Sequence, residues 1–222
     1  MKAPEIRISS DGSHTLYIAG TDEHYHSTYG ALTESRHVFI RNGLLPLLEK
    51  YNTLHILEIG FGTGLNALLT CAVTAGKEIV YHAVEAYPLE PEIWKKLNYP
   101  ELIGGEHTAD RFDKMHASPW GKEVQIRPGF SLYKQQEKAE NLHLPERFYH
   151  LVYFDAFAPE VQPGLWTTEI FTNIGQSMKH GGILVTYSSK GLVKQNLRAA
   201  GFSVKRLPGP PGKRHMVVAE RR

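Results

Sequence analysis

Short apolar runs alternate along the chain with segments in which apolar residues recur every three or four positions. The runs at residues 54–59, 81–85, 123–127, 148–154 and 183–187 have the pattern of buried strands. The segments between these runs have the periodicity of helices, most clearly at residues 65–75, 89–97, 165–179 and 189–200. Two last runs, 202–206 and 216–219, have no helical pattern between them and predict a hairpin. This order predicts a Rossmann-like α/β fold, a seven-stranded mostly parallel sheet with an antiparallel last strand.

The first fifty residues predict an addition to that sheet. Residues 5–19 alternate in polarity on either side of Asp11-Gly12, which indicates a β-hairpin. Residues 22–39 are rich in Tyr, His, Thr and Ser, and we expect them to cover a ligand as a lid. A helical pattern over 32–50 has an expected interruption near Asn42-Gly43. We therefore expect a packed extension over residues 1–50 and one folding unit over 51–222.

The third strand, 123–127, has a consequence for ligand binding. It is followed by Gly129-Phe130-Ser131 and a pattern that we interpret as a helix reaching about residue 141. On this interpretation the turn at the end of the third strand presents Phe130, and no carboxylate, to a ligand.

The first core strand runs directly into the glycine-rich sequence EIGFGTGLN, residues 58–66. Gly60, Gly62 and Gly64 follow the pattern G-x-G-x-G, and glycine permits positive φ and close approach of a ligand to the backbone. Glu85 ends the second strand, 21 residues beyond Gly64. A carboxylate there accepts hydrogen bonds from both hydroxyls of a ribose, so the pattern predicts a nucleoside cofactor.

Two cofactors fit that prediction, NAD and S-adenosylmethionine. A dinucleotide turn has the spacing G-x-G-x-x-G and places a helix N-terminus at a pyrophosphate. Here Glu58 stands two residues before the first glycine, where its negative charge would repel a phosphate and attract a sulfonium or ammonium group. The spacing and this charge favour S-adenosylmethionine, with NAD as the alternative.

Composition adds three expectations. The single cysteine, Cys71, excludes an internal disulfide framework and fits a reducing compartment. The chain has no apolar signal core and no run of eighteen apolar residues, so we expect a cytoplasmic protein without a membrane segment. We expect no metal, because His24 and His26 have no further ligand at a suitable spacing.

Charge is distributed unevenly although the formal net charge is only +2. Residues 188–222 carry nine basic side chains and one acid, Glu220, whereas the rest of the chain is acidic. Such asymmetry indicates a polyanionic partner, or else solvated lysines and arginines on helix and hairpin faces.

A second acid lies beyond the fourth strand, in the sequence FDAFAPEVQPGLW, residues 154–166. Asp155 there is expected at the edge of the sheet where open α/β folds bind ligands. A carboxylate in that place can orient an amine and take its proton as the nitrogen attacks a methyl group. The alternative is a strand-end aspartate that caps the following turn. Phe157 and Trp166 are expected to line the acceptor pocket or, alternatively, to belong to the core.

These stretches resemble the methyltransferase domain of the MnmC family. The resemblance rests on ESRHVFI (34–40), EIGFGTGLN (58–66), VEAYPL (84–89), FDAFAPEVQPGLWTTEIF (154–171), SSKGLVKQNLRAAGF (188–202) and GKRHMVV (212–218). It implies a class I fold that uses S-adenosylmethionine to convert 5-aminomethyl-2-thiouridine to 5-methylaminomethyl-2-thiouridine at the tRNA wobble position. Many members also carry a flavin-dependent oxidase domain, which these residues do not contain. We therefore expect a stand-alone methyltransferase that receives the aminomethyl uridine ready made.

The resemblance also implies roles for individual residues. The acceptor amine is assigned to Asp155. The candidate cofactor residues are Glu58, Gly60, Gly62, Gly64, Asn66, Glu85, Tyr25 and Glu34. The candidate substrate residues are Phe157, Pro159, Trp166, Lys190, Lys213 and Arg214. Two other classes of function remain open on the residues alone: a small-molecule enzyme, either an amine methyltransferase or an aminopropyltransferase related to spermidine synthase, and a non-catalytic RNA-binding module.

Overall fold

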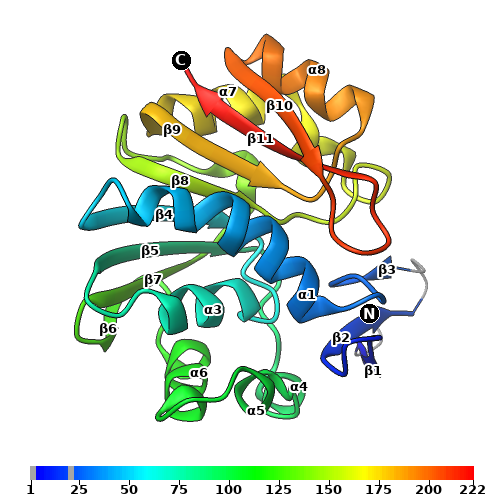
Figure 1. Cartoon of the computed structure of the whole chain (residues 1–222), viewed down its shortest axis with the longest axis vertical. Coiled ribbons are helices and arrows are strands. Elements are labelled where there is room, and N and C mark those ends of the chain that lie inside the picture. The colour runs from blue at the N-terminus through cyan, green and yellow to red at the C-terminus, as the bar shows by residue number, and fades with distance from the viewer. Residues whose placement is uncertain (1–3, 20–22) are drawn as a thin grey trace.

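A computed structural model of the chain describes residues 4–19 and 23–222, so Asp22, in the predicted lid segment, lies outside the described residues. The centre is an eight-stranded sheet in the order β10-β11-β9-β8-β4-β5-β7-β6 (Figure 1). Its strands are β4 (Thr53–Ile59), β5 (Glu78–Glu85), β6 (Glu123–Arg127), β7 (Phe130–Gln136), β8 (Tyr149–Phe154), β9 (Met178–Thr186), β10 (Phe202–Pro208) and β11 (His215–Arg221).

Strand directions confirm the predicted fold class. The neighbouring pairs β7-β5, β5-β4, β4-β8 and β8-β9 are parallel. The last strand, β11, runs antiparallel to both β9 and β10. Seven of the strands therefore form the predicted sheet, and β6 is an additional antiparallel strand at its edge.

The prediction for the third parallel strand was wrong. Residues 123–127 form the edge strand β6, and the third parallel strand is β7, in the segment for which the sequence pattern predicts a helix. Gly129 forms the turn between them, with φ of 75°, at the edge of the sheet opposite the strands' carboxyl ends. Glu137, not Phe130, is consequently the residue that follows the third strand.

Helices cover both faces of the sheet. They are α3 (Leu65–Val73), α4 (Pro91–Trp94), α5 (Tyr99–Ile103), α6 (Thr108–Ala117), α7 (Thr168–Ser177) and α8 (Gly191–Ala199), with short 3₁₀ turns η2 (Ala139–Asn141) and η3 (Pro163–Trp166). Leu54 and Ile56 of β4 belong to one hydrophobic cluster with α3 and α6, and Leu57 and Ile59 belong to a second cluster with α7 and α8. Strand positions alternate between faces, so the two clusters lie on opposite sides. No helix in the described ranges is long and apolar enough to cross a membrane.

The predicted N-terminal hairpin is present as β1 (Glu5–Ile8) and β2 (His14–Ile18), and β3 (Glu23–His24) adds a third strand. A continuous helical segment follows: α1 (Ala31–Ser35), a π-helical stretch η1 (Arg36–Leu44) and α2 (Leu45–Leu48). The expected break at Asn42-Gly43 is absent from this segment. A Cβ at Gly43 would lie 2.9 Å from Val185 of β9, so the glycine allows the helix to pack closely on the sheet.

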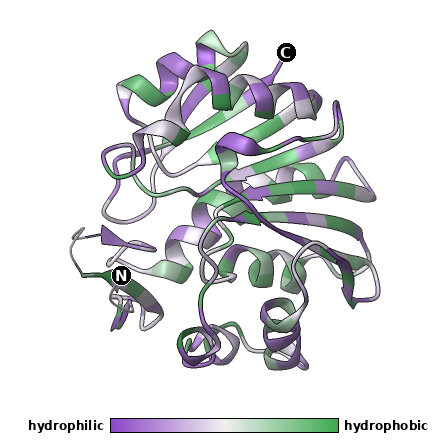
Figure 2. Cartoon of the chain, turned by 180° about the vertical axis from the view of Figure 1, so that it is seen from behind, coloured by the Kyte–Doolittle hydropathy of each residue, from purple (hydrophilic) through white to green (hydrophobic). Residues whose placement is uncertain are grey.

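Hydropathy follows this arrangement. Figure 2 shows that the central strands are mostly hydrophobic, whereas the outer helices mix hydrophobic and polar positions. All six residues of β8 are buried, as expected for a strand covered on both faces. The carboxyl ends of the buried strands β4, β5 and β8 consequently come together at one edge of a rigid sheet.

Candidate active site

A cavity of about 460 Å³ opens at that edge, in the size range of small-molecule sites. The turns after β4 and β5 and the loops after β8 and β9 line the side of the cavity that is formed by the sheet. Residues 23–29 and Glu34 of the N-terminal segment line one side, as the predicted lid requires, and Gly212 and Lys213 of the β10–β11 loop line another. Figure 1 shows this loop, in red, reaching toward the N-terminal sheet.

The glycine turn after β4 forms part of the floor. Gly60, Gly62 and Gly64 have φ of 94°, 47° and 72°, values that favour glycine strongly. A Cβ at Gly60 would lie 2.6 Å from the backbone oxygen of Asp155, so only glycine allows the two strand ends to approach. Gly60 and Gly62 line the cavity, whereas Gly64 lies at the N-terminus of α3, against Phe61 and His116.

Glu85 lies beside this turn at the end of β5. Its Oε2 accepts a hydrogen bond from the Gly62 N–H at 2.9 Å, and its Oε1 accepts one from the Tyr87 N–H at 2.9 Å. These bonds fix the carboxylate on the cavity wall, and each oxygen keeps a second lone pair for a ligand.

Asn66, in the first turn of α3, joins two carboxyl groups. Its Nδ2 donates to Glu58 Oε1 at 3.0 Å and to Asp155 Oδ2 at 2.8 Å. The Tyr81 hydroxyl donates to the other oxygen of Glu58 at 2.9 Å. Glu58 is fully buried and does not line the cavity, because the side chain of Asn66 lies between Glu58 and the cavity. The Asn66 Oδ1 atom is buried without a hydrogen-bond partner among the described residues.

Asp155 lines the cavity immediately beyond β8, and its N–H donates to Ile59 O at 2.9 Å. Burial, and next the negative charge of Glu34, raise the pKa of Asp155 to about 7. The hydrogen bond from Asn66 and the positive charge of Lys213 act in the opposite direction. The result is a carboxyl group that changes its protonation state near neutral pH, as a general base requires.

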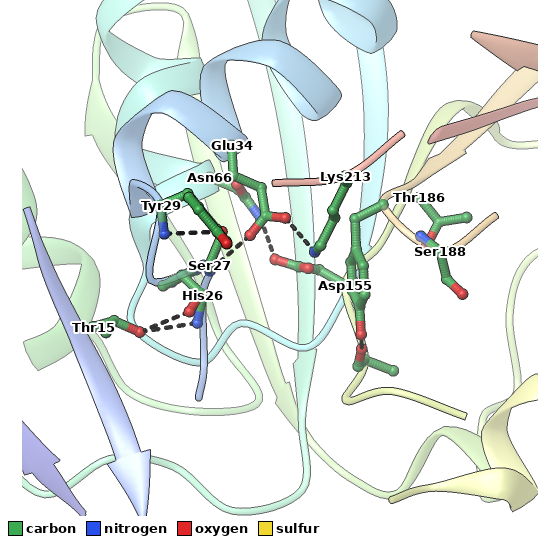
Figure 3. A network of polar contacts seen from close by, with 12 residues as sticks. Thr15, His26, Ser27, Tyr29, Glu34, Asn66, Asp155, Thr186, Ser188 and Lys213 are labelled. Carbon is green, nitrogen blue, oxygen red and sulfur yellow. Dashed lines mark hydrogen bonds and ion pairs between the residues drawn. The ribbon is translucent and has the colours of Figure 1, made fainter. Parts of the chain in front are cut away.

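A second acid, Glu34 of α1, faces the cavity close to Asp155 (Figure 3). Its Oε2 accepts from the Ser27 N–H at 2.9 Å, and its Oε1 forms an ion pair with the Lys213 ammonium group. The Lys213 Nζ atom also lies 3.9 Å from the centroid of the Tyr187 ring. Segments from both ends of the chain therefore meet over the cavity.

The other candidate cofactor residue, Tyr25, packs edge-on against Phe157, with ring centroids 5.0 Å apart. Both rings line the cavity. Burial raises the pKa of Tyr25, so its hydroxyl stays protonated at neutral pH.

The candidate substrate residues divide into two groups. Phe157, Lys190 and Lys213 line the cavity, and Lys190 forms an ion pair with Glu160. Pro159, Trp166 and Arg214 are not among the cavity-lining residues.

Two places were predicted for Trp166, the wall of the acceptor pocket and the core, and the structure places it in the core. It is 1% exposed and packs against Phe154 and Phe171. Its Nε1–H donates to Phe157 O at 2.8 Å, so it supports the loop that carries Phe157.

Several cavity residues were not among the candidates. Tyr187 follows β9, Glu137 follows β7, and Gln162 and Leu165 come from the loop after β8. The Tyr187 hydroxyl donates to Ala156 O at 2.9 Å, which fixes its ring beside Asp155. All four residues lie beyond the carboxyl ends of strands, and this position could have identified them as candidates from the sequence. Glu137 could not be identified in this way, because the third strand had been assigned to the wrong residues.

The two histidines considered as metal ligands are placed differently. His26 is buried, its Nε2 lies 2.7 Å from Thr63 Oγ1, and burial lowers its pKa to about 4. The ring of His24 packs against that of Tyr17 at an angle of 48°, with the centroids 5.0 Å apart. Across the ranges that the structure covers, no three His, Cys, Asp or Glu side chains form a group suited to a metal ion.

Comparison with known proteins gives a consistent set of similarities. The model of a family described as S-adenosyl-L-methionine-dependent methyltransferase matches residues 133–222. The tRNA 5-methylaminomethyl-2-thiouridine biosynthesis bifunctional protein MnmC of Burkholderia multivorans is 30% identical over 97% of this chain and 34% of its own length. The protein of the same name from Cupriavidus metallidurans is 28% identical over 99% of this chain and 34% of its own length. The chain thus spans about a third of the length of the curated relatives it matches.

Two solved structures share the fold. MnmC2 from Aquifex aeolicus superposes with a TM-score of 0.78 and 24% identity, over 100% of this chain and 72% of the other. Spermidine synthase from Thermotoga maritima superposes with a TM-score of 0.60 and 12% identity, over 99% of this chain and 70% of the other. Both alignments include the N-terminal extension as well as the central sheet.

Proposed function

Because the chain is an S-adenosyl-L-methionine-dependent methyltransferase related to the methyltransferase part of the MnmC proteins, we propose that it methylates an exocyclic amine of tRNA. The proposed reaction converts 5-aminomethyl-2-thiouridine to 5-methylaminomethyl-2-thiouridine at the wobble position. A tRNA substrate also fits a cytoplasmic enzyme. The observation that carries the proposal is the position of Asp155, a carboxyl group held by Asn66 just beyond β8, on the wall of the cavity that Gly60, Gly62 and Glu85 also line.

The residues present fit S-adenosylmethionine. Gly60 and Gly62 line the cavity without side chains, and a Cβ at either would press on the Asp155 backbone or the Tyr25 ring that also line it. Glu85 retains acceptor capacity for two ribose hydroxyls. Glu137 and Ala139 beyond β7 would lie on the adenine side. The bound cofactor would supply a methyl group made electrophilic by its attachment to a sulfonium.

The proposed role of Asp155 follows from the state of the substrate. An alkylamine in water is protonated at neutral pH and has no lone pair for attack. Asp155, in its ionised form, would accept one proton from the ammonium group, and the amine nitrogen would then have the lone pair that it needs to attack the methyl group that the cofactor would supply. Asn66 holds the carboxylate in place through Oδ2, which leaves Oδ1 for the substrate.

The basic residues of the C-terminal segment support a polyanionic substrate. Among them, Arg198, Lys205, Arg206, Arg214 and Arg222 are exposed. Lys190, which begins the same segment, lies on the cavity wall. We propose that this segment contacts tRNA phosphates and that Phe157 contacts the base.

Label transfer tests the proposal against its alternatives. The enzyme is incubated with methyl-labelled S-adenosylmethionine and tRNA that carries 5-aminomethyl-2-thiouridine, and in parallel with putrescine or another small amine. The proposal predicts label in tRNA. Label only in the small amine, or transfer of an aminopropyl group from decarboxylated S-adenosylmethionine to putrescine, would contradict it and favour the small-molecule alternatives.

A further inference from the structure

The ammonium group of Lys213 occupies a site on the cavity wall built by other parts of the chain. One side of the site is the Glu34 carboxylate, whose side chain is only 6% exposed and which pairs with Lys213. A carboxylate so deeply buried requires a cationic partner, because an unpaired one would be strongly destabilising.

The other side of the site is an aromatic face. Lys213 Nζ lies 3.9 Å from the centroid of the Tyr187 ring, which is the arrangement of a cation–π contact. The Tyr187 hydroxyl is bonded to Ala156 O, so the ring keeps its orientation without Lys213. Asp155 is close enough for the charge of Lys213 to lower its pKa.

Lys213 itself belongs to a short loop, Gly209-Pro-Pro-Gly-Lys213, between β10 and β11. The loop is closed internally by the Lys213 N–H to Pro210 O at 2.9 Å and the Gly209 N–H to Arg214 O at 3.2 Å. Outside the loop, Gly212 packs on the half-exposed ring of Tyr29. Pro210 of the loop is buried, and the Lys213 ammonium group itself is held at the cavity by Glu34 and Tyr187. The lysine side chain can therefore leave the cavity by rotation about its own bonds, while the loop and the strands keep their places.

We propose that Glu34 and Tyr187 form the subsite for the ammonium group of the acceptor, that Lys213 fills this subsite in the free enzyme, and that the acceptor displaces it. This inference rests on the proposed function, because an aminomethyl uridine carries the same primary ammonium group as a lysine side chain. The subsite adjoins Asp155, so an ammonium group bound there has its proton acceptor at hand. Acceptors without a cationic amine lose this recognition.

Displacement also gives the lysine a second role. Once Lys213 leaves Glu34, its positive charge is free to contact the phosphate backbone of the bound tRNA. Occupation of the subsite by Lys213 lowers the apparent affinity for the amine in proportion to the fraction of enzyme that it blocks. Removal of the lysine ammonium should therefore strengthen binding of a small amine-bearing nucleoside.

The test uses two nucleosides that differ in the amine alone, 5-aminomethyluridine and 5-methyluridine. Their affinities are measured by calorimetry with S-adenosylhomocysteine bound, for the wild type and for Lys213→Met. Lys205→Met is the control, because it removes one exposed charge from β10 in the same hairpin. Lys213→Gln repeats the test with a second neutral side chain, and thermal unfolding establishes that each variant is folded.

We expect Lys213→Met and Lys213→Gln to bind 5-aminomethyluridine roughly tenfold more tightly. The affinity for 5-methyluridine should be unchanged, and Lys205→Met should behave as the wild type. Glu34→Gln should weaken binding of 5-aminomethyluridine alone. An affinity for 5-aminomethyluridine that stays equal or falls in both Lys213 variants would overturn the proposal and make the pair a structural link.

Failure of the proposed function gives a different result. Wild-type enzyme would then transfer no label to tRNA, while the amine-specific gain in the Lys213 variants persists. That outcome would assign the same subsite to the ammonium group of another acceptor.

Discussion

The side-chain amide of Asn66 donates a 2.8 Å hydrogen bond to Asp155 Oδ2 and, from the same nitrogen, a 3.0 Å bond to Glu58 Oε1. One helix side chain thus fixes the proposed base and shields a buried acid behind it. The bond also stabilises the ionised form of Asp155, against the burial that raises its pKa.

The pH dependence of methyl transfer follows from Asp155. Its pKa is raised to about 7, so the ionised form that accepts a proton increases as pH rises through 7. We expect kcat/KM for methyl transfer to rise over that interval. Asn66→Ala removes a bond to the ionised form, and the rising limb should then move to higher pH. A limb at the same pH in both enzymes would contradict the proposed role of Asn66.

The protonation of Asp155 affects the stability of the fold in the opposite direction to its effect on activity: activity should rise with pH, whereas the contribution of Asp155 to the free energy of unfolding should fall. A carboxyl group with a raised pKa binds its proton more tightly in the folded state, so its contribution to folding is lost as pH rises from about 4 to 7. The charges of Glu34 and Lys213 act on Asp155, and Asp155 in turn acts on the buried Glu58.

Glu58 and Glu85 should differ in their effect on cofactor binding. Glu85 lies on the cavity wall and Glu58 lies behind Asn66. We expect Glu85→Gln to weaken binding of S-adenosylhomocysteine by about tenfold, since it loses a charged hydrogen-bond acceptor. Glu58→Gln should leave the affinity unchanged. Calorimetry decides, and the reverse ranking would show that Glu58 reaches the cofactor.

Trp166 should matter for stability and not for substrate recognition. It is buried against Phe154 and Phe171. Trp166→Ala should lower the free energy of unfolding in urea by about 3–5 kcal/mol. The milder Trp166→Phe should remain folded with an unchanged KM for tRNA. A raised KM in this variant without loss of stability would indicate a substrate contact.

Arg214 should contribute to tRNA affinity through charge. It is exposed next to Lys213 in the β10–β11 loop and, unlike Lys213, forms no ion pair with another described residue. Arg214→Gln should weaken tRNA binding and reduce the slope of log affinity against log salt by roughly one. Glu220→Gln, which removes an acid from the same hairpin, should not reduce this slope. An unchanged slope for Arg214→Gln would mean that this residue is a solvated side chain.

The order of the elements was predictable from the sequence because most of the central strands are buried on both faces and are therefore mainly apolar. β4 and β8 show this pattern most clearly, and it fixes Asp155 and the glycine turn at neighbouring strand ends. β7 is different. Its buried positions are Phe130, Leu132 and Lys134, so a lysine interrupts the apolar alternation. The Lys134 ammonium group donates to His116 O at 2.7 Å and lies 4.6 Å from the centroid of a Trp120 ring, and this compensation depends on the tertiary structure.

The same limit applies to the candidate site. Residues at strand ends, such as Glu85 and Asp155, could be placed because the topology brings those ends together. The pair between Glu34 and Lys213 joins residues 179 positions apart, and no local pattern predicts it. The sequence also could not distinguish Phe157, on the cavity wall, from Trp166, in the core, because both are aromatic residues of one loop.

The most direct test of the account is mass spectrometry of nucleosides from tRNA that carries 5-aminomethyl-2-thiouridine, after incubation with S-adenosylmethionine and either wild-type enzyme or Asp155→Ala. The account predicts 5-methylaminomethyl-2-thiouridine with the wild type. It predicts a rate reduced by about 10²- to 10⁴-fold with the variant, which should still bind S-adenosylhomocysteine. An unmodified base with the wild type, or an unchanged rate with Asp155→Ala, would contradict the central claim that Asp155 takes the proton of a tRNA-borne amine.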